Sequence, residues 1–180
     1  MVSLKEYSSE KYRGYFKFLF VRNPYDRLVS GYKQKIRYGM LDKIVKYIIL
    51  KYRNDTSRMN NSQESGPPTF NEFMHYIADK INQFLPIDPH FDKYGNYRTP
   101  CIIDFDFIGK YESLKEDSAI VLEKLFPNKS TKLPEKNVMR SNKTFIDFFR
   151  EVDQKYIETI AKYNADEFAL YGYDPTILLW

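Results

Sequence analysis

Cysteine and histidine are scarce in this sequence, and their scarcity excludes two common kinds of site. Cys101 is the only cysteine, so no disulfide can form within the chain, and a small buried residue is favoured over a reactive thiol. The two histidines, His75 and His90, lie far apart with no cysteine beside either of them. A metal site is therefore not expected.

Long apolar runs are also lacking. No stretch approaches the roughly 20 apolar residues that a helix needs to span a bilayer. The first residues, MVSLKE, do not contain the apolar core of a signal peptide. The sequence as written is expected to have no membrane span and no secretion signal of its own.

What is present is material for one folded domain. The 180 residues are 43% hydrophobic and 17% aromatic, which predicts a sizeable core and excludes a disordered chain. The formal net charge of +4 is compatible with anionic ligands but does not identify one.

Hydrophobic patterns predict strands that alternate with helices. The nearly continuous apolar run 16–21 predicts a strand covered on both faces of a parallel sheet, and 102–108, ended by Gly109, predicts another. Helices are predicted over 24–52 with a break near Gly39, over 70–84 behind a capping box of Thr69 and Glu72, over 112–126 and over 145–163. This alternation indicates the α/β class.

The first strand stops at Arg22, directly before a helix start. Asn23 is a good N-cap, and Pro24 suits the first helical position, so the helix begins at once. A helix start at the carboxyl end of a parallel strand is a place where anions bind, and Arg22 adds a charge that matches phosphate. Ser30 adds a hydroxyl. The alternative is that Arg22 pairs with Asp26 and that Ser30 only packs.

The segment VRNPYDRLVSGY resembles the 3′-phosphate-binding motif of Golgi carbohydrate sulfotransferases of the chondroitin and dermatan 4-O-sulfotransferase type. Three further segments, TFNEFMHYI, HFDKYGNYRTPCIIDFDFIGKYESLKED and YNADEFALYGYD, match motifs of the same family in the same order. Four ordered motifs across nearly the whole chain make the resemblance specific.

The resemblance implies roles for particular residues. Arg22 and Ser30 would hold the 3′-phosphate of the nucleotide, and His90 would be the base for an acceptor hydroxyl, unless it only makes one structural hydrogen bond. Asp106 and Glu112 would be ligands or would brace a strand-to-helix turn. The loop and helix start around the phosphate would be shaped by Asn23, Pro24, Tyr25, Asp26, Arg27, Leu28 and Val29.

The resemblance also implies a fold and a reaction. The fold would be a partial P-loop-NTPase-like sulfotransferase fold, a parallel sheet flanked by helices. The enzyme would transfer a sulfuryl group from 3′-phosphoadenosine-5′-phosphosulfate (PAPS) to a glycan hydroxyl without a metal, on the lumenal side of the Golgi membrane. The acceptor would be a glycosaminoglycan-like chain or an N- or O-glycan. Four Asn-x-Ser/Thr sequons agree with a lumenal glycoprotein: Asn54, Asn60, Asn128 and Asn142.

Departures from the family pattern qualify this picture. Only 21 residues precede Arg22, and they contain neither the loop that holds the 5′-phosphosulfate nor an anchor. Residues 1–180 are therefore predicted to be a single sulfotransferase domain, the C-terminal two-thirds of the family's catalytic domain, inactive by itself. The alternative is a non-catalytic homologue that binds glycan or nucleotide. A nucleic-acid partner is not expected, because the lysines look scattered and no nucleic-acid motif occurs.

Overall fold

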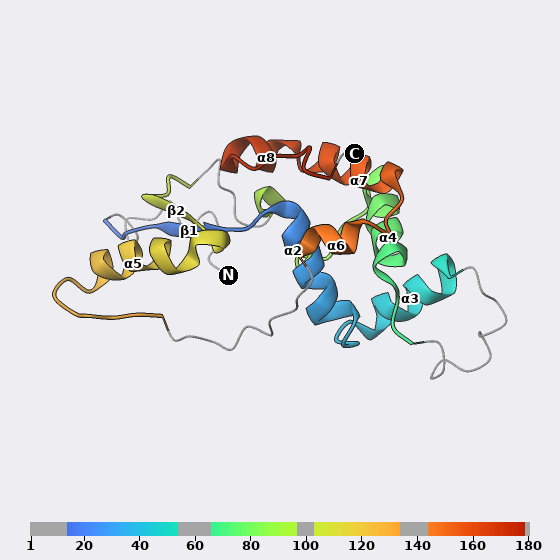
Figure 1. Ribbon diagram of the computed structural model, residues 1–180, viewed down its shortest axis with the longest axis horizontal. Coiled ribbons are helices and arrows are strands. Elements are labelled where there is room, and N and C mark those ends of the chain that lie inside the picture. The colour runs from blue at the N-terminus through green and yellow to red at the C-terminus, as the bar shows by residue number, and fades with distance from the viewer. Residues whose placement is uncertain (1–13, 54–65, 97–102, 134–143, 179–180) are drawn as a thin grey trace. The chain divides into compact units, whose positions relative to one another are not determined.

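The computed structural model describes residues 14–53, 66–96, 103–133 and 144–178 (Figure 1). It divides into two compact units. The sheet unit comprises residues 1–22 and 94–140, and the helical unit comprises residues 23–93 and 141–180. The assignment of residues 1–180 to one sulfotransferase domain stays a prediction.

The sheet unit contains two parallel strands. Strand β1 (Phe18–Val21) pairs with β2 (Phe107–Lys110), and the register places Val21 opposite Lys110. A single 3₁₀ turn, Tyr111–Ser113, then leads into helix α5 (Leu114–Leu125), which packs against β2. The predicted α/β class with a parallel sheet and flanking helices is confirmed.

The position of β2 differs from the prediction. Gly109 lies inside the strand instead of ending it. The reason is a close contact, since a Cβ at Gly109 would lie 2.6 Å from Cε1 of Phe20 and 2.9 Å from Cε1 of Phe107. Only a glycine lets these two rings close over the strand.

Strand β1 is also less covered than its sequence predicts. Val21 is its only buried residue, and Phe18 is exposed. The prediction that this strand is covered on both faces is therefore wrong for the residues that the structure describes. Its start is braced by Asp106, whose Oδ2 accepts the backbone N–H of Lys17 at 2.7 Å. This contact braces the start of β1, not the strand-to-helix turn for which Asp106 was considered.

The helical unit begins with the helix predicted after Arg22. Helix α2 (Pro24–Gly31) continues into a π-helical segment, Tyr32–Ile36, and a turn then leads to α3 (Asp42–Tyr52). Gly39 in that turn has a φ of +67°, which an L side chain rarely adopts, so the predicted break near Gly39 is confirmed. Helix α4 (Phe70–Asn82) follows the predicted capping box of Thr69 and Glu72.

The predicted helix over residues 145–163 is two helices. Helix α6 (Phe145–Phe149) starts at a capping box of Thr144 and Asp147, and α7 (Gln154–Tyr163) starts after Asp153. Asp153 starts the second helix because its carbonyl accepts the N–H of Tyr156 at 2.9 Å. A further helix, α8 (Ala165–Tyr171), ends at Gly172 in the left-handed conformation and was not predicted.

Aromatic residues form much of the core of the helical unit. The ring of Tyr25 on α2 lies 5.3 Å from that of Phe149 and 5.0 Å from that of Phe168, centroid to centroid. All three side chains are fully buried or nearly so. Helix α2 is thus fixed by contacts with segments more than a hundred residues later in the chain. None of the helices in the described ranges is long and apolar enough to cross a membrane.

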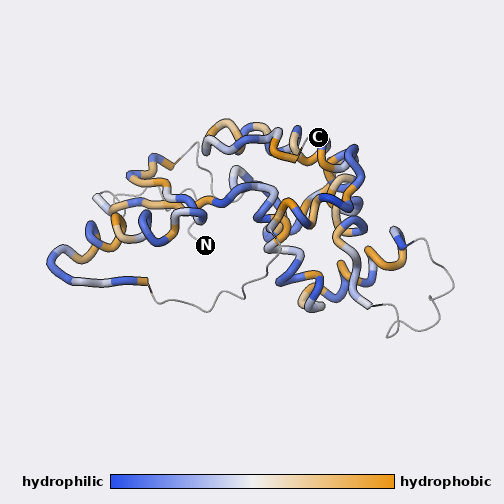
Figure 2. Tube along the Cα trace, in the orientation of Figure 1, coloured by the Kyte–Doolittle hydropathy of each residue, from blue (hydrophilic) through white to orange (hydrophobic). Residues whose placement is uncertain are grey.

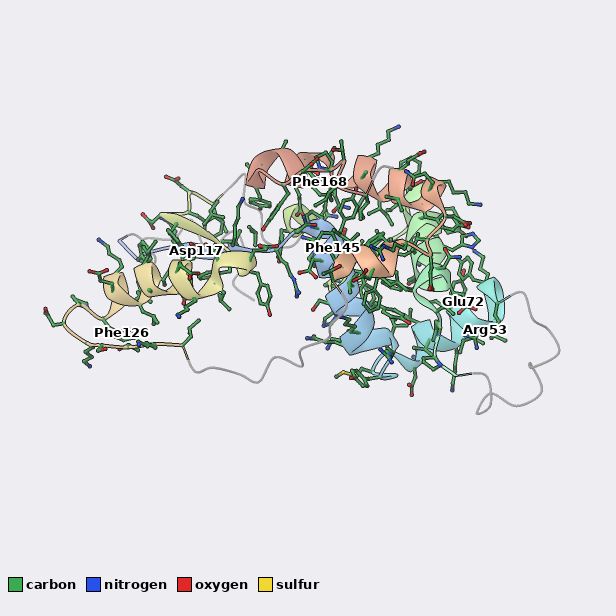
Figure 3. All side chains as sticks on the ribbon, in the orientation of Figure 1. Arg53, Glu72, Asp117, Phe126, Phe145 and Phe168 are labelled. Atoms are coloured by element: carbon green, nitrogen blue, oxygen red, sulfur yellow. The ribbon has the colours of Figure 1, made fainter. Side chains whose placement is uncertain are left out.

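An ion pair joins α3 to α4. Both side chains are largely buried, and Nε and Nη2 of Arg53 each lie 2.9 Å from a carboxylate oxygen of Glu72 (Figure 3). Burial by itself raises the pKa of Glu72, but hydrogen bonds from Arg53 and from the Thr69 N–H outweigh it and lower the pKa below its ordinary value. Glu72 therefore serves both the capping box and the packing of two helices.

The Glu72→Gln variant is expected to lower the free energy of unfolding by about 1–3 kcal/mol at pH 7, since Arg53 loses its charged partner. A lowered carboxyl pKa stabilises the fold fully above the unfolded value of about 4.3 and less as pH falls through the folded value. Urea titrations from pH 7 to pH 3 should therefore show a shallower acid decline for the variant. The exposed Glu158→Gln on α7 is the control, and equal behaviour of the two variants would contradict the prediction.

Candidate functional site

Arg22 lies at the carboxyl edge of the two-stranded sheet. Because Val21 is opposite Lys110 in a parallel pair, Arg22 and Tyr111 leave their strands at the same edge. The Cζ atom of Arg22 lies 4.2 Å from the centroid of the Tyr111 ring, a cation–π contact. Half-buried Arg22 is thus oriented by a residue that the sequence analysis did not single out.

The turn after β2 is braced by a residue that was also missed. Oδ2 of Asp117 accepts the backbone N–H of Lys110 at 2.6 Å and the hydroxyl of Ser113 at 2.8 Å. These two hydrogen bonds lower the pKa of Asp117 below its ordinary value. Asp117 thus braces the strand-to-helix turn and holds the segment that carries Tyr111.

The start of α2 is capped as predicted, with one consequence for anion binding. Oδ1 of Asn23 accepts the backbone N–H of Tyr25 at 2.9 Å, and Pro24 has no N–H to offer. The backbone at these two positions therefore offers no open amide to an anion.

The predicted nucleotide-binding residues of α2 divide into two groups. Pro24, Tyr25, Leu28 and Val29 are buried in the core of the helical unit. Burial, with Asp174 nearby, raises the pKa of the Tyr25 hydroxyl to about 12. Asp26 and Ser30, four residues apart on one helix face, stay half-exposed. Of the two, Ser30 has a neutral hydroxyl that can donate to a phosphate oxygen.

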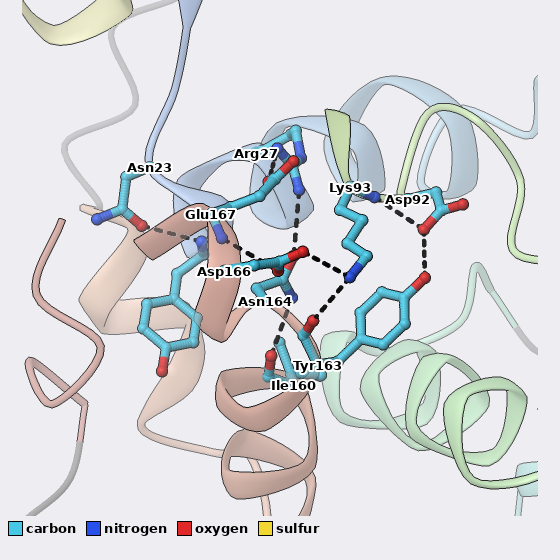
Figure 4. Close-up of polar contacts among 10 residues, drawn as sticks. Asn23, Arg27, Asp92, Lys93, Ile160, Tyr163, Asn164, Asp166 and Glu167 are labelled. Atoms are coloured by element: carbon cyan, nitrogen blue, oxygen red, sulfur yellow. Dashed lines mark hydrogen bonds and ion pairs between the residues drawn. The ribbon is translucent and has the colours of Figure 1, made fainter. Parts of the chain in front are cut away.

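Arg27 lies in a buried ion pair. Its Nη1 is 2.7 Å from Oε2 of Glu167, and its Nη2 donates to Oδ1 of Asn164 at 3.3 Å (Figure 4). Glu167 is only 3% exposed at its side chain. Arg27 therefore joins α2 to the junction of α7 and α8, within the YNADEFALYGYD motif.

The same junction holds the segment that carries His90. The hydroxyl of Tyr163 donates to Oδ1 of Asp92 at 2.6 Å, and Nζ of Lys93 lies 2.9 Å from Oδ2 of Asp166 (Figure 4). Asp92 is buried. These contacts fix residues 88–93 against the helices that also hold Arg27.

His90 forms a pair with Asp88 at the surface of the helical unit. Its Nδ1 lies 2.7 Å from Oδ1 of Asp88, which also accepts the backbone N–H of His90 at 2.9 Å. The His90 side chain is 49% exposed. A carboxylate can only accept, so Nδ1 donates to Asp88, and in the neutral ring Nε2 is then the nitrogen with the lone pair.

The His90 segment packs on α2 beside Ser30. A Cβ at Gly31 would lie 2.8 Å from Cδ1 of Phe91 and 3.1 Å from the carbonyl oxygen of His90. The glycine at position 31 permits this approach. The structure thus brings Ser30 and the His90 segment together in the helical unit, and Arg22 and Tyr111 together in the sheet unit.

Metal ligands do not gather in the parts of the chain that the structure describes. Within residues 14–53, 66–96, 103–133 and 144–178, no group of three or more histidine, cysteine, aspartate or glutamate side chains could hold a metal ion. Cys101 lies outside these ranges.

The family model and the relatives that match this chain are all sulfotransferases. A model described as the sulfotransferase family matches residues 1–174. Carbohydrate sulfotransferase 14 of Danio rerio is 32% identical over 89% of this chain and 44% of its own length. Carbohydrate sulfotransferase 11 of Mus musculus is 29% identical over 95% of this chain and 51% of its own. Carbohydrate sulfotransferase 8 of Mus musculus is 36% identical over 60% and 26%. The chain thus spans about half of these relatives at most, and no solved structure shows significant similarity.

Proposed function

Since the chain belongs to the sulfotransferase family, we propose that it is a carbohydrate sulfotransferase that uses PAPS as donor and a glycan hydroxyl as acceptor. One observation carries the proposal. Strand β1 ends at Val21, and only Arg22 and the N-cap Asn23 stand between it and helix α2, so the residues of the phosphate motif follow the strand directly. The names of the relatives support a carbohydrate acceptor.

Arg22 and Ser30 are the proposed contacts of the nucleotide 3′-phosphate. A guanidinium that stacks on a ring through its face donates hydrogen bonds from its edge, so the contact with Tyr111 is compatible with phosphate binding. Ser30 is half-exposed, and no hydrogen bond of its hydroxyl is found in the described ranges. Asn23, Pro24, Tyr25, Asp26, Arg27, Leu28 and Val29 position these two side chains through the cap, the core and the buried ion pair.

His90 is the proposed general base. When bound, PAPS supplies a sulfuryl group whose bond to the bridging phosphate oxygen breaks as a bond from sulfur to the acceptor oxygen forms. His90 would accept the proton of the acceptor hydroxyl at Nε2, while Asp88 holds Nδ1 and stabilises the charged ring. The pair needs no metal for this proton transfer.

A lumenal Golgi location with a membrane attachment is proposed on the same premise. Of the four sequons, Asn128 is the one within the described residues, and it is exposed in the segment after α5. An oligosaccharide at Asn128 would meet no buried surface. Asn54, Asn60 and Asn142 lie outside the described residues.

Two measurements on the purified chain test the function. Calorimetry with 3′,5′-adenosine bisphosphate and with 5′-AMP asks whether the 3′-phosphate is recognised, and transfer of labelled sulfate from PAPS to glycan acceptors asks whether the chain is catalytic. Equal affinity for the two nucleotides would contradict the nucleotide site. Recognition without transfer is the result expected both for a domain that is inactive by itself and for a non-catalytic homologue. Transfer that is lost in His90→Gln at unchanged nucleotide affinity would support His90 as the general base.

The Ser30→Ala variant is expected to weaken binding of the bisphosphate by about twofold to tenfold, because one neutral hydrogen bond contributes about 0.5–1.5 kcal/mol. Binding of 5′-AMP should not change. Gln34→Ala, an exposed change in the π-helical segment, is the control. Unchanged bisphosphate affinity in Ser30→Ala would return Ser30 to a packing role.

A further inference from the structure

Positive charge is concentrated in one short stretch of the chain. Residues 33–53 contain seven lysines and arginines and a single acidic residue, Asp42, a net charge of +6, whereas the whole chain has +4. The expectation that the lysines are scattered is therefore wrong for this stretch. It spans part of the π-helical segment, the following turn and α3.

Part of this charge is neutralised within the helical unit and part is not. Lys51 pairs with Asp79 at 3.1 Å, and Arg53 pairs with Glu72. In the described ranges, no ion pair or hydrogen bond is found for the side chains of four others, which are exposed or half-exposed and are called here the basic strip: Lys35, Arg37, Lys43 and Lys46. The strip is the uncompensated part of the charge.

Apolar side chains accompany the basic strip. Lys43, Lys46, Tyr47 and Leu50 follow one another at the three- and four-residue spacing of a single face of α3, and all four are exposed. Tyr47 is 46% exposed and Leu50 is 67% exposed, while Ile48 and Tyr52 are buried on the other side. Hydrophilic and hydrophobic residues alternate along the helix (Figure 2).

The exposed ring of Tyr47 is held in place. Its centroid lies 5.9 Å from that of Tyr76 and 6.2 Å from that of Tyr52, both edge-on. A fixed aromatic ring beside lysines offers an apolar face and cations to one ligand, with little side-chain entropy to lose. Acidic sugars are ligands that combine an anionic group with apolar C–H faces.

We propose that the basic strip and Tyr47 bind the acceptor as an acidic polysaccharide, whose carboxylate or sulfate groups contact the cations while a sugar ring packs on Tyr47. This assignment rests on the proposed function, which supplies a glycan acceptor. The strip is also connected to the phosphate motif, because α2 continues directly into the π-helical segment that carries Lys35. Ser30 and Lys35 therefore lie on one continuous helical segment, and Lys43 and Lys46 follow on α3 after the turn. Figure 1 shows this order of α2 and α3.

The test is binding of the purified chain to unsulfated chondroitin, with neutral dextran and a DNA oligonucleotide as comparison polymers. The variant Lys43→Gln/Lys46→Gln is expected to bind chondroitin about fivefold to thirtyfold more weakly than wild type. Its slope of log affinity against log salt concentration should be smaller by about 1 to 2. A protein with two fewer cations releases fewer counterions from the polysaccharide when it binds. The matched control is Lys124→Gln/Lys129→Gln, two exposed lysines of the sheet unit, which should bind as wild type does.

Each remaining outcome contradicts part of the proposal. Equal binding by wild type and the Lys43→Gln/Lys46→Gln variant would contradict the proposal that the basic strip binds the polysaccharide. An equal loss of binding in the control variant would contradict it too. Tighter binding of DNA than of chondroitin at the same salt would overturn the acidic sugar as its ligand. Calorimetry with 3′,5′-adenosine bisphosphate separates the two proposals. If that nucleotide fails to bind while chondroitin binding depends on Lys43 and Lys46, the basic strip is supported as a polysaccharide site and the proposed use of PAPS is contradicted.

Discussion

The Arg27→Met variant is expected to lower the free energy of unfolding by about 3–5 kcal/mol, the cost of removing one partner from a buried ion pair. Nη1 of Arg27 lies 2.7 Å from Oε2 of Glu167, and the Glu167 side chain is 3% exposed. Methionine fills a similar volume, so the loss is mainly the charge that remains buried at Glu167. The Asn164 side chain also loses a donor.

Urea denaturation followed by circular dichroism measures this loss. Arg150→Met is the matched control, since Arg150 is 69% exposed and pairs with Asp147 at 3.2 Å within one helical turn. A surface pair of this kind contributes about 0–1 kcal/mol. In Arg27→Met/Glu167→Leu, which removes both charges, stability should recover in large part. If Arg27→Met is no less stable than Arg150→Met and instead binds the bisphosphate weakly, Arg27 is a ligand contact and the structural assignment is wrong.

The Arg22→Ala variant is expected to bind 3′,5′-adenosine bisphosphate about 10- to 150-fold more weakly, because a charged hydrogen bond contributes about 1.5–3 kcal/mol. Its affinity for 5′-AMP, which lacks the 3′-phosphate, should be close to that of wild type. The difference between the two ligands isolates the contact of Arg22 with that phosphate from any general effect on the site.

Two further variants complete this measurement. Arg22→Lys keeps the charge but not the planar fork or the stacking on Tyr111, so it should recover only part of the affinity. Arg150→Ala removes an exposed arginine elsewhere and should bind both nucleotides as wild type does. An equal loss for bisphosphate and 5′-AMP in Arg22→Ala would show that Arg22 supports the fold of the site without contacting the 3′-phosphate.

The sequence by itself determined the features that depend on neighbouring residues. Asn23 and Pro24 start α2, Thr69 and Glu72 start α4, and Gly39 marks a break, all as predicted. Each of these is fixed by hydrogen bonds or backbone preferences within about one helical turn, so the local residues contain the information. The prediction of one helix over residues 145–163 was wrong, because a continuous apolar pattern gave no sign of the second helix start after Asp153.

The sequence also placed Arg22, Ser30 and His90 in matching motifs, but it did not show what each side chain contacts. Only the tertiary structure decided that Arg27 pairs with Glu167, which is 140 residues away along the chain, and that Tyr111 stacks on Arg22. Only the tertiary structure showed that Lys51 and Arg53, among the cations of residues 33–53, form ion pairs with carboxylates of α4. Local patterns specify where helices and strands begin, whereas the partner of a side chain depends on which distant segments pack against it, and that depends on the burial of the whole core.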